Sequence, residues 1–291
     1  MPIFYPDILQ QGTAARPFEY GDKEVMLYAV GIGMGANPLD ERELSFVYEN
    51  GLKVVPTAVT VLADSVMRGV SAAVPDGLRF STWDMFKMLH GEQKVEIHKP
   101  LPAQGAFTFS DQIIGAFDKG PDKGAIILSE SKWFDAAGDV AVTLTTTRFA
   151  RGDGGFGGPA DGAPKPHPTP TRAPDMSLDI VTRPDQAVIY RLNGDRNPLH
   201  VDQAFARKGG FDQPILHGLC TYGITCRAVM QGMLDYDSES IASHQVRFSS
   251  PVYPGETVTV DMWRDGKEIA FEARIKARDL YVIRNGLTRL R

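Results

Sequence analysis

The sequence contains two diverged copies of one pattern, and this internal repeat constrains the fold more than any other feature. Tyr28 is followed by "AVGIGMGANPLD" and Tyr190 by "RLNGDRNPLH", and both segments contain Asn-Pro-Leu. Further similarities occur in the same order in both copies. Pro56 and Pro214 each precede an apolar stretch, and "KPLPAQGAFTF" in the first copy corresponds to "SPVYPGETVTV" in the second. Similarities that recur in one order predict two copies of one supersecondary unit.

A linker separates the two copies. The segment "RGDGGFGGPADGAPKPHPTPTRAP", residues 151–174, is rich in Gly and Pro and has neither helical nor strand periodicity. It divides the 291 residues into a first unit of residues 1–150 and a second of residues 175–291. Both lengths suit a small domain.

Each copy is expected to fold as a curved sheet around one central helix. In the second copy we predict this helix from about Ile215 to Met233, after a proline. Four small residues are expected to let a sheet approach it: Gly218, Cys220, Gly223 and Ala228. The segments "HQVRFSS", "ETVTVDMW" and "EIAFEARI" alternate as strands do. The prediction is an α+β fold in which two units form a pseudo-dimer within one chain.

The stretch "YRLNGDRNPLH" brings an acid, an amide and an imidazole together, as Asp195, Asn197 and His200. Its simplest interpretation is a polar turn, because Asn-Gly, Asp and Asn-Pro are all turn formers. The first copy, however, keeps Asn-Pro-Leu but has "MG", residues 34–35, where Asp195 falls, and Asp40 where His200 falls. A turn would need similar residues in both copies, so this difference favours a duplicated catalytic site that only one copy has kept.

These residue types suit proton transfer. A carboxylate and an imidazole that converge on one water can orient it and exchange protons near neutral pH. The Asn197 amide is expected to hold the water or one of its partners. His217 and Gly218 show the same asymmetry, since Val59-Thr60 stands opposite them. In the first turn of a helix the Gly218 N–H has no intrahelical partner and can polarise a carbonyl. His217 is either a helix-start residue whose ring bonds nearby backbone, or a residue that steers the water site.

The same stretches carry a family resemblance. "YRLNGDRNPLHVDQAFA" resembles the hydratase 2 signature of the MaoC-like (R)-specific enoyl-CoA hydratases, and "GFDQPILHGLCTYG" and "VRFSSPVYPGETV" resemble its continuation. In the first copy "LKVVPTAVTVL", "LHGEQKVEIHKPLP", "DKG" and "GGFGG" resemble the longer, duplicated type found in peroxisomal multifunctional β-oxidation enzymes. One departure is Asn193, where the family usually has a smaller residue. The resemblance implies a double hotdog fold that adds water to a trans-2-enoyl-CoA, giving the (3R)-3-hydroxyacyl-CoA.

The resemblance also implies roles for individual residues. Asp195 and His200 would hold the catalytic water with help from Asn197, and the Gly218 N–H would receive the thioester oxygen. Four residues would contact the acyl-CoA: His90, Gly91, Lys119 and Phe248. Three others would support the catalytic residues from behind: Tyr190, His217 and Asp202. The degenerate first copy would house the acyl chain. Which of Asp195 and His200 is the base stays open, because coupled groups share their titration.

Other functions were weighed on the same residues. A hotdog acyl-CoA thioesterase and a non-catalytic acyl-CoA binder are the alternative functions. "GIGMG", residues 31–35, follows a strand-like "EVMLYAV" but lacks the third spaced glycine of a dinucleotide loop. The remaining histidines are interpreted as surface or strand residues: His98, His167 and His244.

A metal site is conceivable from one cluster of residue types: Asp195, Asn197, His200 and Asp202. The Asn-Pro turn and the lack of a histidine pair at a regular spacing count against it. We therefore expect neither a metal nor another cofactor, with the CoA thioester as substrate.

Composition limits the partners and the compartment. The net charge of −5, without a long basic run, argues against nucleic acid. No secretory signal and no apolar run of membrane-spanning length are visible, so we expect a cytoplasmic protein without a membrane partner. Cys220 and Cys226 are expected to be free thiols. A homodimer is left open, since hotdog sheets commonly pair edge to edge.

Overall fold

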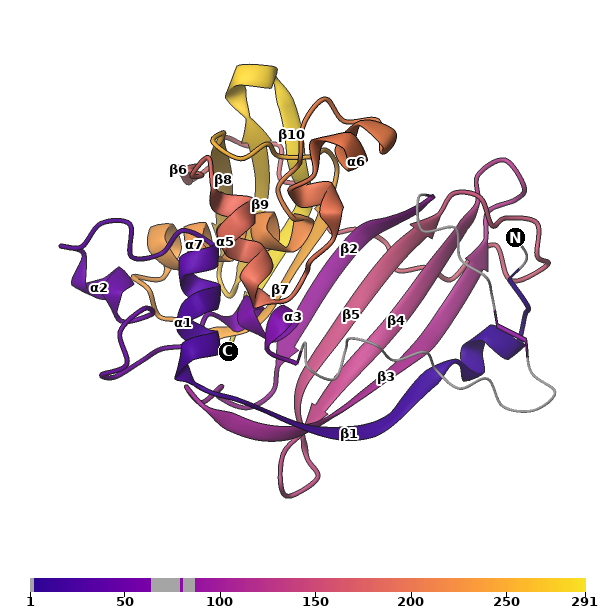
Figure 1. The fold of residues 1–291 in the computed structure, drawn as a ribbon, viewed down its shortest axis with the longest axis horizontal. Helices are drawn as coiled ribbons and strands as arrows, with labels where there is room; N and C mark the ends of the chain where they lie inside the picture. The colour runs from indigo at the N-terminus through magenta and orange to yellow at the C-terminus, as the bar shows by residue number, and fades with distance from the viewer. Residues whose placement is uncertain (1–2, 64–78, 81–86) are drawn as a thin grey trace.

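The computed structural model describes residues 3–63, 79–80 and 87–291. Its strands form one ten-stranded antiparallel sheet, in the order β1-β3-β4-β5-β2-β7-β10-β9-β8-β6 (Figure 1). The N-terminal strands are β1 (Gly12–Tyr20), β2 (Met88–Ile97), β3 (Gly105–Asp118), β4 (Ala125–Phe134) and β5 (Val140–Ala150). The C-terminal strands are β6 (Met176–Val181), β7 (Ile241–Phe248), β8 (Thr257–Asp265), β9 (Glu268–Ile275) and β10 (Leu280–Leu290).

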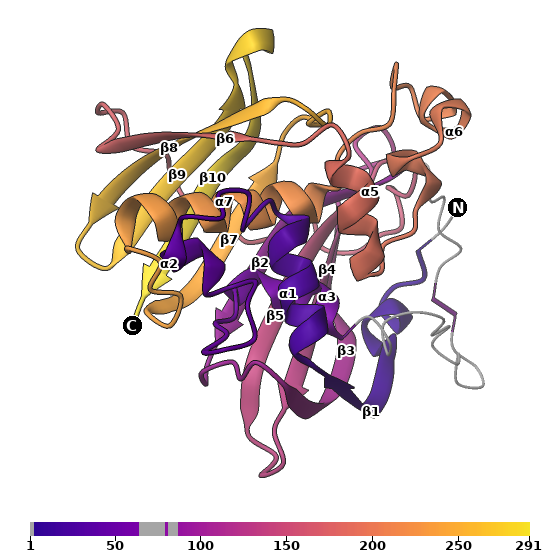
Figure 2. The same cartoon turned by 60° about the vertical axis from the view of Figure 1, so that its left-hand side comes forward.

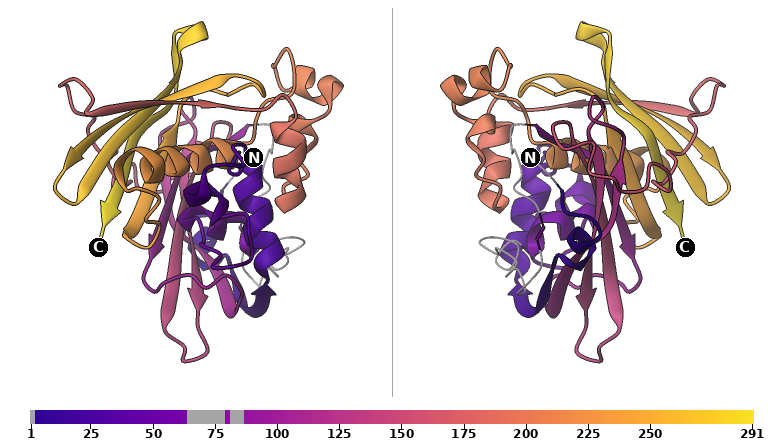
Figure 3. Two further views of the ribbon diagram at one scale, coloured as in Figure 1. Left: turned by 90° about the vertical axis from the view of Figure 1, so that its left-hand side faces the viewer. Right: turned by 90° about the vertical axis from the view of Figure 1, so that its right-hand side faces the viewer.

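The strand order displays the repeat. In each half the first strand (β1 or β6) lies at the outer edge, the second (β2 or β7) lies at the centre of the sheet, and the other three fill the space between in chain order. Strands β2 and β7 pair from Glu92 opposite Arg247 to Glu96 opposite Ser243. The side views show the C-terminal strands, orange to yellow, above the magenta N-terminal strands (Figure 3). This arrangement confirms the predicted α+β double hotdog.

Short helices and one long helix accompany the sheet. The α-helices are α1 (Asp22–Gly31), α2 (Glu41–Leu44), α3 (Val59–Leu62), α5 (Gln186–Tyr190), α6 (Gln203–Lys208) and α7 (Gly218–Met233). The 3-10 helices are η1 (Asp7–Gln10), η2 (Pro56–Ala58), η3 (Arg191–Asn193), η4 (Pro198–His200) and η5 (Lys276–Arg278). Helix α7 lies along the C-terminal strands (Figure 2). The predicted continuation of the first-copy helix beyond Ala63 falls outside the described residues. None of the described helices has the length and hydropathy needed to cross a membrane.

Helix α7 begins three residues later than the sequence predicted. The Leu216 N–H donates to the Val252 carbonyl at 2.7 Å, and His217 has an extended backbone with a ψ of 135°. The segment before α7 is therefore tied to the loop after β7, and the helix starts only at Gly218. This offset places His217 outside the helix and directly at its N-terminus.

The segment "EVMLYAV" forms helix α1, so its prediction as a strand was wrong. Asp22 and Glu24 lie in the first turn, and the Glu24 carboxylate accepts a hydrogen bond from the Gly21 N–H at 3.0 Å. Acidic residues at this position satisfy the free N–H groups and the dipole of a helix start. A local apolar run could not reveal this cap.

Helix α1 packs against α7 across the boundary between the halves. A Cβ on Gly223 would lie 2.5 Å from the Ile32 Cγ2 and 2.6 Å from the Tyr28 hydroxyl. Gly223 therefore makes room for a helix of the other half, whereas the sequence predicted a sheet there. The rings of Tyr28 and Tyr190 lie 6.1 Å apart, so α1 and α5, which precede the two repeated turns, also meet. One continuous core of buried apolar residues runs through both halves.

Candidate active site

The Asn-Pro-Leu motif builds the same turn in both halves. The Asn37 Oδ1 accepts from the Leu39 N–H at 3.1 Å, and the Asn197 Oδ1 accepts from the Leu199 N–H at 3.0 Å. A side chain that bonds the backbone two residues on is an Asx-turn. The shared residues are thus explained by the turn, and only the residues that differ between the halves remain to be explained by function.

Asp40 is the counterpart of Asp202 and not of His200, which corrects the alignment of the two copies. The Asp40 carboxylate accepts from the Arg42 N–H and caps α2, while the Asp202 carboxylate accepts from the Phe205 N–H at 3.0 Å and caps α6. Asp202 therefore serves as a helix cap, a different role from the support of the catalytic residues that was expected. His200 and the residue after it are additional in the second copy.

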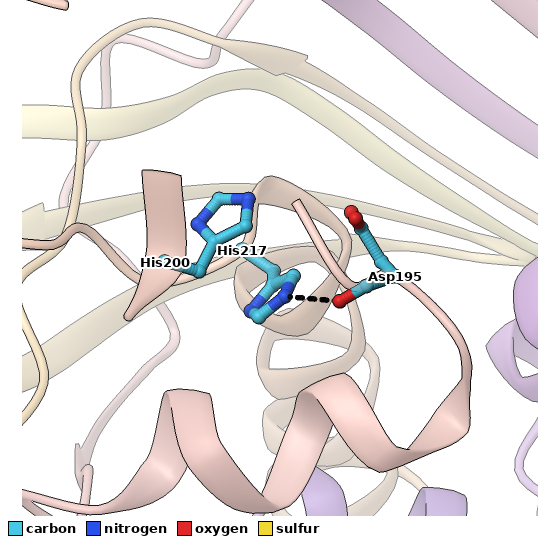
Figure 4. A group of neighbouring side chains, drawn as sticks. All are labelled: Asp195, His200 and His217. Atoms are coloured by element: carbon cyan, nitrogen blue, oxygen red, sulfur yellow. Dashed lines mark hydrogen bonds between the residues drawn. The ribbon is translucent and has the colours of Figure 1, made fainter. Parts of the chain in front are cut away.

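Asp195, His200 and His217 come together as the sequence predicted for the first two. One side-chain ligand atom of each lies within 4.8 Å of those of the other two (Figure 4). Gly194 has a φ of +136°, a backbone conformation that glycine adopts readily, and it turns the chain into Asp195. His200 ends the helix η4, and His217 precedes α7.

The hydrogen bonds of His200 define its tautomer. Its Nδ1 lies 2.8 Å from the Ile215 carbonyl oxygen, which can only accept, so Nδ1 carries the proton and Nε2 keeps its lone pair. Burial lowers the pKa of His200, while the nearby Asp195 carboxylate raises it. The ring is therefore neutral at pH 7, with a free basic nitrogen beside Asp195.

His217 fixes the backbone of Asp195. Its Nε2 donates to the Asp195 carbonyl oxygen at 3.1 Å, as the dashed line in Figure 4 marks. Burial, and next the neighbouring His200, lower the pKa of His217 to about 4. Among the described residues, the buried Nδ1 has no hydrogen-bond partner. Both interpretations of His217 are thus compatible, because the backbone that its ring bonds is that of Asp195.

Asn197 supports Asp195 through its backbone. The Asn197 N–H donates to the Asp195 Oδ1 at 3.1 Å, while its own side-chain oxygen is engaged in the turn. The ring of Tyr190 packs near that of His217, with the two centroids 5.0 Å apart. Asn193, the departure from the family pattern, donates from Nδ2 to the Tyr190 carbonyl at 2.9 Å and lies against Gly31 of α1. Its larger side chain is therefore accommodated where α1 and α5 meet.

Strand β2 brings His90 of the N-terminal half to the candidate active site. The ring of His90 meets that of Phe248 edge-on, with centroids 4.9 Å apart. A Cβ built on Gly218 would lie 3.5 Å from Phe248. Burial, and next the Arg148 charge, lower the pKa of His90 to about 4, while Asp195 acts in the opposite direction. The β2–β7 pairing thus brings His90 and Phe248 together beside the first turn of α7.

Gly91 has a structural explanation. The pairing of β2 with β5 shifts register between His90 and Glu92. A Cβ at Gly91 would lie only 2.5 Å from the Phe149 ring. Glycine at this position therefore leaves room for the Phe149 ring. The contact with substrate that was predicted for Gly91 stays a prediction.

Lys119 lies on the rim of an open cleft. Asp118 holds the local backbone by accepting 2.8 Å hydrogen bonds from the N–H groups of Gly120, Gly155 and Gly157, which lowers the pKa of its carboxyl group. The Lys119 ammonium donates to the Ala160 carbonyl. The cleft has a volume of about 630 Å³, and four cationic residues line it: Lys119, Lys123, Arg151 and Arg247.

A second cavity, of about 290 Å³, lies on the inner face of the N-terminal sheet. His90 and Leu219 line it, so it reaches the first turn of α7. Six polar residues that the sequence analysis did not single out also line it: Gln93, Asp111, Ser129, Ser131, Thr146 and Arg148. Five of them, all except Gln93, lie in "FSD", "LSES" and "TTTR", whose polar residues look like those of an ordinary solvated strand face.

The geometry of the two imidazoles disfavours a shared metal ion. The rings of His200 and His217 are stacked, with centroids 3.7 Å apart and planes inclined by 27°. Each nitrogen lone pair lies in the plane of its own ring, so the free lone pairs of nearly parallel rings cannot converge on one ion at about 2 Å. The stacking of His200 on His217 therefore disfavours chelation of one ion by both rings.

Comparisons with known proteins cover both halves. Residues 165–285 match the MaoC like domain, and residues 18–152 match the MFE-2 hydratase 2 N-terminal domain. The chain is 38% identical over 289 residues to "Enoyl-CoA hydratase ChsH3" of Mycobacterium tuberculosis, covering 99% of this chain and 98% of that protein. It is also 38% identical to the peroxisomal multifunctional enzyme type 2 of Drosophila melanogaster, covering 87% of this chain and 43% of that enzyme. The solved MaoC-like dehydratase of Phytophthora capsici superposes with a TM-score of 0.86 and 32% identity, over 98% of this chain and 97% of that one.

Proposed function

The chain belongs to the MaoC-like hydratase 2 family, and on that premise we propose that it adds water to a trans-2-enoyl-CoA. The product is the (3R)-3-hydroxyacyl-CoA, and the reverse reaction is its dehydration, so the enzyme is a hydro-lyase. The observation that carries the proposal is the meeting of Asp195 and His200 beside the N-terminus of α7, in the only half that has both residues. The thioester is the substrate, and the reaction needs no cofactor.

Asp195 and His200 hold and activate the water. The free Nε2 of His200 can accept a proton from it, and the Asp195 carboxylate can orient it through a second hydrogen bond. The water oxygen bonds to C3 of the enoyl group as one of its O–H bonds breaks. The catalytic pair then delivers a proton to C2. His217 and Asn197 position Asp195 for this step.

Gly218 stabilises the charge that develops during addition. As water attacks C3, the electrons of the C2=C3 bond move towards the thioester oxygen. The Gly218 N–H begins a helix of 16 residues, where N–H groups lack intrahelical acceptors and the dipole favours negative charge. Phe248 and His90 flank this point and would hold the enoyl group.

The two cavities would divide the rest of the substrate between them. The cleft with Lys119, Lys123, Arg151 and Arg247 suits the phosphates of CoA, because ammonium and guanidinium groups bind phosphate. The cavity on the N-terminal sheet, which reaches the first turn of α7 at Leu219, would take the acyl chain. We therefore assign acyl-chain binding to residues 1–150, catalysis to residues 175–291, and a linking role to residues 151–174.

Location and assembly remain proposals. We propose a cytoplasmic protein, although relatives of the same family are named as peroxisomal. We also propose that a homodimer is the assembly to test first, by light scattering coupled to size-exclusion chromatography. A monomer by that measurement would reject it.

Crotonyl-CoA distinguishes the three candidate functions. Hydration removes the absorbance of the conjugated enoyl thioester and frees no thiol. A thioesterase would release free CoA in step with the loss of crotonyl-CoA, and a thiol reagent would detect it. A non-catalytic binder would leave both signals unchanged. We expect loss of absorbance without free thiol, and a chiral analysis of the product should give the (3R) isomer.

A further inference from the structure

The inner face of the N-terminal sheet is unusually polar for an acyl-chain site. Five neighbouring side chains from three adjacent strands line its cavity: Asp111, Ser129, Ser131, Thr146 and Arg148. A plain alkyl chain would take water from these groups and give them no hydrogen bond in return, which costs free energy. Phe109, Leu144 and Leu219 also line the cavity, so it mixes apolar and polar groups, and a purely hydrocarbon chain would leave the polar groups without a partner.

Part of this polar face is satisfied internally. The Gln93 Oε1 accepts from the Thr146 hydroxyl at 3.0 Å and lies 3.1 Å from the His90 Nε2. The Asp111 Oδ1 accepts from the Ser131 hydroxyl at 2.7 Å. These groups define the walls of the cavity without needing a ligand.

Arg148 is not satisfied in this way. Its Nη1 donates to the Ser129 hydroxyl at 2.9 Å, which is its one hydrogen bond within the part of the chain that the structure describes. The described residues also give it no ion pair, although its side chain is partly buried. A guanidinium has several N–H donors in a fixed plane, and Arg148 lines the cavity, so its remaining donors are available to an acceptor bound there.

The charge of the cavity limits what this acceptor can be. Asp111 lines the same cavity, and its carboxylate would repel a second anion. A neutral oxygen avoids that repulsion and can still accept from Arg148. Ser129, Ser131 and Thr146 supply hydroxyls that can donate to or accept from such a group.

We propose that the N-terminal cavity selects an acyl chain that carries a neutral oxygen function, a ketone or a hydroxyl, and that Arg148 donates a hydrogen bond to it. This inference rests on the proposed hydration of enoyl-CoA esters and specifies their class. Arg148 lies opposite His90 in the β2–β5 pairing, so the oxygen that it meets would lie on the part of the acyl chain that follows the enoyl group. We therefore expect Arg148 to act on specificity and not on the proton transfer itself.

Matched substrates test the proposal in the wild-type protein. The series contains trans-2-decenoyl-CoA, the same ester with a ketone or hydroxyl moved along the chain beyond the double bond, and trans-2-decenedioyl-CoA, which ends in a carboxylate. We expect kcat/KM to rise by about tenfold or more, relative to decenoyl-CoA, when the neutral oxygen reaches Arg148. Equal values for the plain and oxygenated chains at every position would overturn the proposal. A preference for the dioate above all others would overturn the neutral class.

Variants then assign the preference to Arg148. The quantity compared is the ratio of kcat/KM for the best oxygenated ester to that for decenoyl-CoA, so that a general loss of activity cancels. Arg148→Met should bring this ratio close to one, whereas Arg148→Lys should keep part of it. Arg289→Met removes an exposed arginine of β10 that pairs with Glu268, and it should leave the ratio unchanged. An unchanged ratio in Arg148→Met would refute the assignment.

Crotonyl-CoA separates this test from the test of the proposed function. Its acyl group ends in a methyl group just beyond the double bond, so it carries no ketone or hydroxyl for Arg148 to bind. Wild-type turnover of crotonyl-CoA without any preference among the longer esters would reject only the inference about Arg148. Absence of crotonyl-CoA hydration would reject the proposed function itself.

Discussion

The imidazole rings of His200 and His217 stack with their centroids 3.7 Å apart. One ring donates to the Ile215 carbonyl and the other to the Asp195 carbonyl, so each is held in a single orientation. Burial lowers the pKa of both rings, and a proton on one opposes a proton on the other. His200 therefore keeps a free basic nitrogen while it stacks on a neutral neighbour that also holds the backbone of Asp195.

Loss of either member of the catalytic pair should abolish most of the activity. We expect Asp195→Asn and His200→Ala each to reduce kcat for crotonyl-CoA by ~10² to 10⁴, because both groups act on one water. Circular dichroism should show that the fold persists. The matched control is Asp40→Ala, whose side chain caps α2 and should leave kcat within about tenfold. A near wild-type kcat in either catalytic variant would disprove the assignment.

His217 should act by positioning. His217→Phe keeps a ring that can stack on His200 but removes the N–H that bonds the Asp195 carbonyl. We expect kcat to fall by about tenfold while KM changes little, since an interaction needed in the transition state is lost. Steady-state kinetics with crotonyl-CoA checks this split. A rise in KM at constant kcat would instead show that His217 contributes to binding of the substrate in its ground state.

The cationic cleft should affect binding more than chemistry. Lys119→Ala and Arg247→Ala each remove a charge from the proposed phosphate site. We expect KM for crotonyl-CoA to rise severalfold at nearly constant kcat, and more steeply at low salt, where phosphate contacts are least screened. Crotonyl-pantetheine lacks the nucleotide. If these substitutions raised its KM as much as the KM of crotonyl-CoA, the cleft would not be a phosphate site.

Stability should fall in acid because of a buried histidine. His244 was interpreted from the sequence as a surface or strand residue; it lies in β7 but is fully buried, between the hydroxyls of Thr225 at 3.1 Å and Thr288 at 2.7 Å. Burial lowers the pKa of His244 from 6.5 to about 3. Between these values the unfolded chain binds a proton that the folded chain does not, so the stabilisation is complete above pH 6.5 and is lost as the pH falls towards 3.

Urea unfolding from pH 7 to pH 4 measures this effect. Each such histidine changes the free energy of unfolding by at most ~1.4 kcal/mol per pH unit. Burial also lowers the pKa values of His90 and His217 to about 4, so these two residues change the unfolding free energy in the same direction. His244→Gln should make the slope shallower, while His167→Gln in the linker should not change it. The same slope in His244→Gln as in the wild type would contradict the prediction.

Removal of metal ions should not affect activity. Stacked rings inclined by 27° are poorly placed to direct their free nitrogens to one ion, so we expect no step to depend on a metal. Prolonged dialysis against EDTA should leave kcat within about twofold of the untreated enzyme. Inactivation that zinc then reversed would show a metal site at this cluster.

The repeated pattern allowed much of the site to be predicted from the sequence. Asp195 and His200 stood out because the first copy lacks them, and Gly218 because it lies in the first turn of the predicted helix. Helix α7 was predicted to within three residues. These features depend on local pattern and on comparison of the two copies, both of which a sequence displays.

Features that depend on contacts between the halves could not be predicted. Helix α1 looked like a strand because its apolar run is short and its cap is made by Glu24. Gly223 faces Tyr28 of the other half, and His90 meets Phe248 only through the pairing of β2 with β7. Arg148 was not predicted as a site residue, because the sequence does not tell which face of a sheet encloses a cavity.

The pairing of β2 with β7 also makes each half dependent on the other. A fragment that contained only the catalytic unit would expose the whole edge of β7, and unpaired strand edges recruit other strands. Such fragments should therefore associate in pairs through β7, with a second catalytic unit where the N-terminal half now stands. That assembly would regain a continuous sheet and carry two copies of Asp195 and His200, but it would lose His90 and the polar cavity. In the whole chain the N-terminal half therefore stands where a second catalytic unit would otherwise pair, and it contributes His90 and the polar cavity there.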